Sequence, residues 1–126
     1  MEITLDTLVE HLKQRQQFGR SIGSNQVLQH RAVDLVTEIE QARSIVILAA
    51  SRMGTLLQSR SVLMCKNLCG RVAVKVSEET IQMHGGIAMT WESPVSHYAK
   101  RLVMIDAQLG DSDYHIKRVM AALQAA

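Results

Sequence analysis

The chain has 126 residues, of which 47% are hydrophobic, 21% are charged and 3% are aromatic, and its net charge is +2. This length predicts one domain, residues 1–126, with room for a buried core, and the scarcity of aromatic residues favours packed helices over a β-sandwich. The small, mixed charge argues against a nucleic-acid surface, and the longest apolar run, 45–50, is too short to span a membrane. The acidic N-terminus lacks a signal pattern, so we expect a cytoplasmic protein.

A first helix is predicted over residues 2–17, because apolar side chains recur there at helical spacing. These side chains are Ile3, Leu5, Leu8, Val9 and Leu12. We expect the helix to stop at Gly19 and residues 21–25 to form a polar turn. The periodicity is already present at the first residues, which indicates a truncated helix and a chain that is part of something longer.

A second helix is predicted over residues 26–54, because its apolar side chains alternate in steps of four and three residues. These side chains are Leu28, Ala32, Leu35, Ile39, Ala42, Val46, Ala49 and Met53. Such a helix is about 43 Å long at the standard rise, and the alanines in it favour a closely packed neighbour. We expect Gly54 to end it.

A third helix is predicted over residues 61–84, and Gly70 within it is expected to permit a close contact. Its apolar side consists of Cys65, Cys69, Val72, Val76 and Met83. We interpret the two cysteines, one helical turn apart, as small buried hydrophobic side chains. A disulfide or metal site is the less favoured alternative, since no histidine or acidic partner stands at ligand spacing, and we expect no bound metal.

Two further helices are predicted beyond a loop over residues 85–93. Pro94 suits the first turn of a fourth helix, whose apolar stripe runs to Leu109. Asp111 or Ser112 is expected to cap a short terminal helix. Short links between long amphipathic helices imply antiparallel neighbours. The sequence therefore predicts an all-α fold, an up-and-down helical bundle of four long helices plus a short C-terminal helix.

Two glycine-ended motifs are the most informative feature of the sequence. They are Arg15-Gln16-Gln17-Phe18-Gly19 and Gln82-Met83-His84-Gly85-Gly86. Each follows an amphipathic stretch and ends at the residue type that most easily closes a helix in the left-handed conformation. A guanidinium, amides and an imidazole precede the glycines, and such donors suit a phosphate or pyrophosphate. From the residues alone, however, an exposed arginine beside an ordinary helix end is the favoured interpretation.

In this order and at this separation, the two motifs resemble the C-terminal helical domain of the flavin-dependent acyl-CoA dehydrogenases. Ile22, Gln26 and the segments 87–94 and 98–101 fit the same pattern. The resemblance runs from about Leu5 to the C-terminus. It implies FAD as the cofactor, an acyl-CoA thioester as the substrate, and α,β-desaturation with hydride transfer to the flavin as the reaction.

The resemblance also implies roles for residues of the first motif. Arg15, Gln17 and Phe18 match residues that reach the FAD pyrophosphate of a neighbouring subunit, where a guanidinium grips phosphate oxygens and a ring packs on the cofactor. Gln26 matches a further contact to the same cofactor, although a polar residue at the start of a helix explains it nearly as well.

Residues of the second motif match another contact to the dinucleotide. The amide of Gln82 would supply hydrogen bonds, and Gly85 and Gly86 would allow the backbone to approach the pyrophosphate closely. A pair of glycines after a helix is otherwise only a helix end and a turn. We interpret His84 as a structural hydrogen-bonding residue rather than an acid or base.

The sequence departs from the family pattern where the catalytic base is expected. Many members carry Tyr-Glu-Gly-Thr between the last two helices, and that glutamate removes the alpha proton of the acyl-CoA. Aligning the glycines puts Leu109 at this position, and leucine cannot accept a proton. Asp111 is a weak candidate, because a carboxylate two residues further along needs a different backbone path to the same carbon. No catalytic residue is therefore assigned.

The leading hypothesis is a C-terminal domain or fragment of an FAD-dependent acyl-CoA dehydrogenase that contributes cofactor and oligomer contacts. The family's N-terminal helical domain and central β domain have no counterpart in the sequence, so the isolated chain is expected to be inactive. The alternative is a non-catalytic helical assembly module or a base-less partner subunit. Expected partners are further copies of the chain, in a dimer or tetramer, or a subunit that supplies the missing domains.

Overall fold

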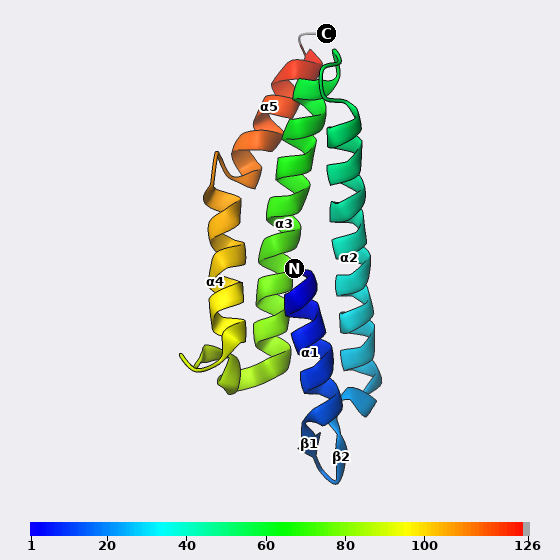
Figure 1. The fold of residues 1–126 in the computed structure, drawn as a ribbon, viewed down its shortest axis with the longest axis vertical. Helices are drawn as coiled ribbons and strands as arrows, with labels where there is room; N and C mark the ends of the chain where they lie inside the picture. Colours follow the sequence, from blue (N-terminus) through cyan, green and yellow to red (C-terminus); the bar gives the residue numbers. More distant parts are fainter. Residues whose placement is uncertain (125–126) are drawn as a thin grey trace.

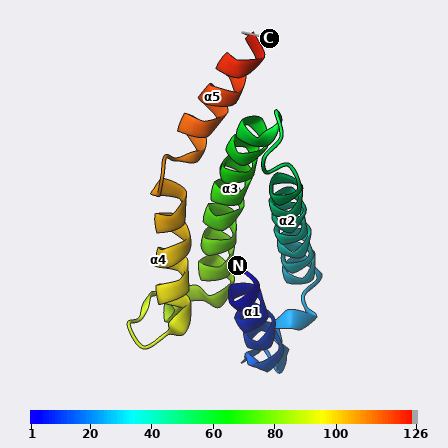
Figure 2. The same cartoon turned by 45° about the horizontal axis from the view of Figure 1, so that its top comes forward.

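The computed structural model describes residues 1–124 and contains five α-helices in this range, arranged as a bundle (Figure 1). The helices are α1 (Glu2–Gln14), α2 (Gln26–Ser51), α3 (Gln58–His84), α4 (Pro94–Ala107) and α5 (Ser112–Gln124). Helices α1 to α4 alternate in direction, which confirms the expected all-α, up-and-down bundle. Helix α5 continues in the direction of α4 instead of reversing, as both views show (Figures 1 and 2).

Helix α3 is the centre of the bundle, because it contacts each of the other four helices. The buried core lies between α3 and its neighbours. It is formed by Leu8, Leu12, Leu35, Ile39, Ala42, Val72, Ala73, Val76, Met83 and Leu102. These side chains are aliphatic or methionine, as the low aromatic content of the chain requires.

The heptad pattern of the second helix is correct over most of its length and wrong at two positions in its later half. Leu35, Ile39, Ala42 and Ala49 are buried as expected, whereas Val46 and Met53 are exposed. Figure 1 shows that α1 begins about midway along α2, so α1 does not cover the later part of the helix. The helix also ends at Ser51, before Gly54.

The first helix does not extend to residue 17 or end at Gly19, and this expectation is wrong. Helix α1 stops at Gln14, and a small antiparallel hairpin follows, in which β1 (Gln16–Gln17) pairs with β2 (Arg20–Ser21). Phe18 and Gly19, with φ values of 53° and 78°, form its two-residue turn. Positive φ at both central residues is the pattern of a type I′ turn, whose twist matches that of paired strands.

Hydrogen bonds tie the hairpin to the end of α1. The Ser21 hydroxyl donates to the Leu12 carbonyl over 2.8 Å, which satisfies one of the free carbonyls of the last helical turn. The short helix η1 (Ile22–Ser24) then leads into α2. A Cβ on Gly23 would lie 2.7 Å from the Leu12 carbonyl oxygen, so the absence of a side chain allows η1 to pack against α1.

The remaining boundaries agree better with the sequence. Helix α3 begins at Gln58, three residues earlier than expected, and ends at His84 as predicted. Gly85 then has a φ of 72°, and the short helix η2 (Gly85–Met89) occupies part of the expected loop. Pro94 lies in the first turn of α4, as expected, and α4 ends at Ala107.

Gly70 permits the close contact that its position in a helix predicted. A Cβ at this position would lie 1.9 Å from the Asp106 Oδ1 atom, so α4 approaches α3 directly over the glycine. Beside it, the Lys66 ammonium donates to the carbonyls of Ile105 and Asp106 over 3.0 and 2.8 Å. A lysine that binds the last carbonyls of a helix stabilises that end, and here it ties the end of α4 to α3.

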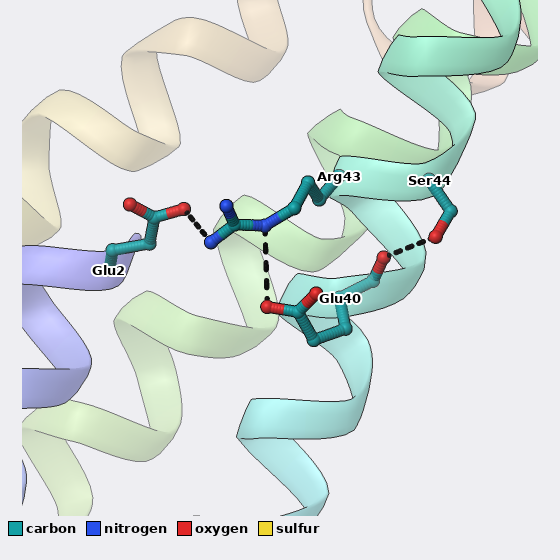
Figure 3. A network of polar contacts seen from close by, with 4 residues as sticks. All are labelled: Glu2, Glu40, Arg43 and Ser44. Carbon is teal, nitrogen blue, oxygen red and sulfur yellow. Dashed lines mark hydrogen bonds and ion pairs between the residues drawn. The ribbon is translucent and has the colours of Figure 1, made fainter.

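A polar network links the start of α1 to α2 on the surface (Figure 3). The Arg43 guanidinium contacts Glu2 at 2.5 Å and Glu40 at 3.3 Å, and the Ser44 hydroxyl donates to the Glu40 carbonyl at 2.8 Å. Both ion pairs are exposed, and exposed pairs contribute little to stability. The network therefore adds little to the stability of the bundle.

Within residues 1–124, no helix combines the length and the apolar composition needed to cross a membrane. The expected cytoplasmic location stays a prediction.

Candidate dinucleotide-binding end

The first motif lies at the junction between α1 and the hairpin, at the lower end of the bundle in Figure 1. Arg15 follows the last residue of α1 in an extended conformation, and Arg15, Gln17 and Phe18 are all exposed. Within residues 1–124, no hydrogen bond or ion pair engages the Arg15 guanidinium. The neighbouring Arg20 differs, since its guanidinium donates to the Asn25 side-chain oxygen over 2.9 Å. Arg15 is therefore available to an external anion.

Phe18 has an environment that the fold does not explain. The side chain is 100% exposed, and its φ of 53° lies in the left-handed region, where a non-glycine residue costs roughly 1–2 kcal/mol. Asparagine or glycine is the preferred residue at this position of a type I′ turn. A large apolar ring that is both strained and exposed stabilises neither the turn nor the core, so the fold gives no account of it.

The second motif lies where α3 ends and η2 begins. Gln82, Gly85 and Gly86 are exposed there. Gly85 has φ 72° and ψ −155°, a conformation that is essentially restricted to glycine, so the fold itself requires this residue. Gly86 lacks positive φ, and a Cβ added to it would meet nothing within 4 Å. The fold therefore does not require Gly86 to be glycine, and its backbone is open to a ligand.

A stacked pair of histidines connects the two motifs. The rings of His11 and His84 have centroids 4.3 Å apart and planes inclined by 26°. The His84 Nδ1 atom donates to the Thr80 carbonyl over 2.9 Å, which agrees with the structural role expected of His84. His11 lies one helical turn before Arg15, so the stack holds the end of α1 against the end of α3. Gln26, the first residue of α2, is exposed at the same end of the bundle.

A groove of about 690 Å³ opens between α1, η2 and the start of α4. Its lining includes both stacked histidines and the acidic side chains of Asp6, Glu10 and Glu92. Burial, and then the nearby His84 and Arg15, lower the pKa of His11. The hairpin, the groove and the role of His11 were not predicted from the sequence. Of these three features, only the role of His11 had a signal in the sequence, namely its spacing of four residues from Arg15.

The turn between α4 and α5 contains the two residues considered for the catalytic base. Leu109 is 92% exposed with a φ of 62°, so its side chain points into solvent. The Asp111 Oδ1 atom accepts the Tyr114 amide over 2.7 Å, which confirms Asp111 as the cap of α5. This turn lies directly after α4, whereas the second motif lies before α4. The two features are separated by about 21 Å of helix at the standard rise.

The two cysteines lie on one face of α3, as expected, with their sulfur atoms 4.0 Å apart. Both are free thiols. Burial, together with the neighbouring Cys65, raises the pKa of Cys69 to about 11, so its thiol is protonated at neutral pH and is a poor nucleophile. In the described part of the chain, no group of three or more histidine, cysteine or acidic side chains has an arrangement that could hold a metal ion.

Comparison with known proteins identifies the family. Residues 1–124 match the family model described as "Acyl-CoA dehydrogenase, C-terminal domain". Acyl-CoA dehydrogenase IpdE2 of Mycolicibacterium smegmatis is 35% identical over 117 residues, which cover 93% of this chain and 36% of that protein. The chain therefore belongs to the acyl-CoA dehydrogenase family, as the C-terminal helical domain, which confirms the family resemblance.

Solved structures agree with this assignment. Butyryl-CoA dehydrogenase from Megasphaera elsdenii superposes with a TM-score of 0.90 at 27% identity, over 98% of this chain and 32% of that one. The ChsE4–ChsE5 complex from Mycobacterium tuberculosis superposes with a TM-score of 0.93 at 23% identity, over 99% and 34% of the two chains, which shows a common fold. The chain thus spans about a third of the length of these relatives.

Proposed function

We propose that residues 1–126 form one domain and act as the C-terminal domain of an FAD-dependent acyl-CoA dehydrogenase. The reaction would be the α,β-desaturation of an acyl-CoA thioester. In this proposal the lower end of the bundle binds the diphosphate of FAD, and the helices provide contacts to further copies of the chain. Family membership supports the class of reaction, and the exposed residues at this end support the cofactor.

The residues present fit a dinucleotide diphosphate. Arg15 offers a guanidinium with five donors and no partner within the described residues, and Gln17 and Gln82 offer exposed amides. Gly86 leaves its backbone open, while Gly85 shapes the turn before it. Gln26 would add a further amide at the start of α2. When bound, FAD supplies the hydride acceptor of the reaction, and the residues of this chain hold and orient the diphosphate.

Phe18 is the single observation that carries the proposal. A fully exposed aromatic ring in a left-handed turn costs stability and gains nothing within the chain. A planar cofactor that packs on the ring would restore the lost burial. The family role implied for Phe18 therefore accounts for a feature that the fold leaves unexplained.

Substitution of Phe18 by asparagine tests this interpretation. Because asparagine suits a type I′ turn, Phe18→Asn is expected to raise the free energy of unfolding by about 0.5–1 kcal/mol. The same change should weaken FAD binding by about 1–2 kcal/mol, since the apolar contact with the cofactor is lost. Chemical denaturation and calorimetric titration with FAD measure the two effects.

Leu56→Asn is the matched control, since Leu56 is also fully exposed but lies in the link between α2 and α3, at the opposite end of the bundle. It should leave FAD binding unchanged. A Phe18→Asn variant that loses stability and keeps wild-type affinity for FAD would show that Phe18 serves the hairpin and not a cofactor.

The alternative function is a non-catalytic assembly module or a base-less partner subunit. The specific observation in its favour is the apolar surface on α4 and α5, where several large side chains are exposed. They include Val103, Met104, Ile116, Met120 and Leu123. Monomers rarely expose large contiguous apolar patches, so we propose self-association through these helices, as a dimer or tetramer. FAD binding separates the two functions, because only the first requires the cofactor.

A further inference from the structure

The stacked histidines occupy the boundary between the two motifs proposed to bind the diphosphate. His11 lies one helical turn before Arg15, and its ring stacks on His84, whose neighbours Gly85 and Gly86 begin η2. Both rings also line the groove between α1 and η2. Any change in the charge of this pair therefore changes the electrostatic interaction with an anion bound at either motif.

The two histidines differ in burial and in hydrogen bonding. His84 donates from Nδ1 to the Thr80 carbonyl, so its neutral ring has the lone pair on Nε2. That Nε2 atom is buried and has no hydrogen-bond partner among residues 1–124. His11 is only partly buried and lines the groove, so it is the ring of the pair that is open to solvent and to a bound anion.

The charged side chains that face His11 determine how strongly protonation of His11 affects the binding of an anion. Arg15 is the cation at the end of α1, while Asp6 and Glu10 from α1 and Glu92 from the link before α4 are acidic and line the same groove. Glu10 is already paired with the Lys13 ammonium at 3.0 Å, so among the described residues Asp6 and Glu92 are the acidic side chains of this lining without an ion pair, and Arg15 is the nearby cation. A protonated His11 adds a positive charge between the two motifs.

We propose that His11 takes up a proton when the diphosphate of the dinucleotide binds beside Arg15, so that cofactor binding strengthens as the pH falls. This inference rests on the proposed function. An anion nearby favours the charged imidazole and raises its pKa in the complex. In the free protein, burial, His84 and Arg15 hold the pKa of His11 below its ordinary value. Affinity should be highest below the pKa of the free protein and should fall as the pH rises through the pKa of the complex.

FAD itself is the appropriate probe, because both of its phosphates are esterified and keep their charge over the range in which histidine titrates. We expect its affinity for the wild-type chain to fall about threefold to tenfold between about pH 5 and about pH 8, since one pKa unit corresponds to a factor of ten. In His11→Phe, which keeps an aromatic ring on His84, the affinity should be independent of pH and should equal the wild-type value at high pH.

Four controls separate the possible outcomes. His30→Phe, at an exposed histidine of α2, should keep the wild-type pH dependence. Circular dichroism should show that His11→Phe retains its helices, and an NMR titration of the imidazoles in the wild-type chain should show the pKa of His11 rising when FAD is added. Arg15→Ala at each pH reports whether the diphosphate binds at this end of the bundle.

An unchanged pH dependence in His11→Phe, or a pKa of His11 that FAD does not move, would overturn this inference. If Arg15→Ala still weakened binding in that case, the proposed function would stand. Failure of millimolar FAD to bind the wild-type chain at any pH would overturn the inference and the proposed cofactor role together.

Discussion

Acyl-CoA dehydrogenation by the isolated chain is expected to be undetectable, even with FAD in excess. The reaction needs a base at the alpha carbon, and Leu109 at the expected position is an exposed alkyl side chain. Asp111, the other residue considered for this role, already accepts the Tyr114 amide at the start of α5. General base catalysis contributes about 10²- to 10⁴-fold to a rate, so its loss alone would reduce turnover to a small fraction. A dye-reduction assay with short and long acyl-CoA substrates measures this.

Asp111→Asn and Ser112→Ala serve as comparisons in that assay. Asparagine also caps helices well, so Asp111→Asn should leave stability nearly unchanged and should have no activity to remove. Measurable turnover by the wild-type chain that disappears in Asp111→Asn, but not in Ser112→Ala, would contradict the assignment and would identify Asp111 as the base.

Arg15→Ala is expected to have the largest effect on cofactor binding. A hydrogen bond to a charged group contributes about 1.5–3 kcal/mol, so the affinity for FAD should fall roughly 10- to 150-fold. Arg15→Lys should restore only part of it, because an ammonium cannot reproduce the paired donors of a guanidinium. Neither change should alter the free energy of unfolding by more than about 0.5 kcal/mol, since no partner within residues 1–124 engages this side chain. Calorimetric titration of FAD into each variant provides the measurement.

Arg20→Ala is the matched control for Arg15→Ala. Arg20 lies on the same hairpin, but its guanidinium is engaged by Asn25. Its removal should weaken the hairpin slightly and leave FAD binding within about twofold of the wild type. Equal losses of affinity in the two variants would indicate a general effect of positive charge in place of a specific contact with Arg15.

The helices were largely predictable from the sequence, because long stretches of apolar spacing dominate their stability. Pro94, Gly85 and Asp111 each stand at an end of a helix where their chemistry predicts them. The hairpin was not predictable in the same way. Its turn contains Phe18, a residue that type I′ turns disfavour, so local preference argued against the structure that forms.

The candidate site was likewise predictable only in part. Arg15 and the second motif could be singled out from the sequence, because their residue types and the family pattern agree. The stack of His11 on His84 joins residues more than seventy positions apart, and a single sequence carries no signal for such a contact. The exposure of Val46 and Met53 was missed for a related reason, since a heptad pattern does not reveal how far a neighbouring helix extends.

The measurement that tests the central claim most directly is an NMR titration of the chain with FAD, followed through the backbone amides. Shifts are expected at residues 15–19 and 82–86, at the lower end of the bundle in Figure 1, and the turn at residues 108–111 should remain unperturbed. Shifts confined to residues 108–111, or no shifts at millimolar FAD, would contradict the assignment of this end of the bundle to the cofactor.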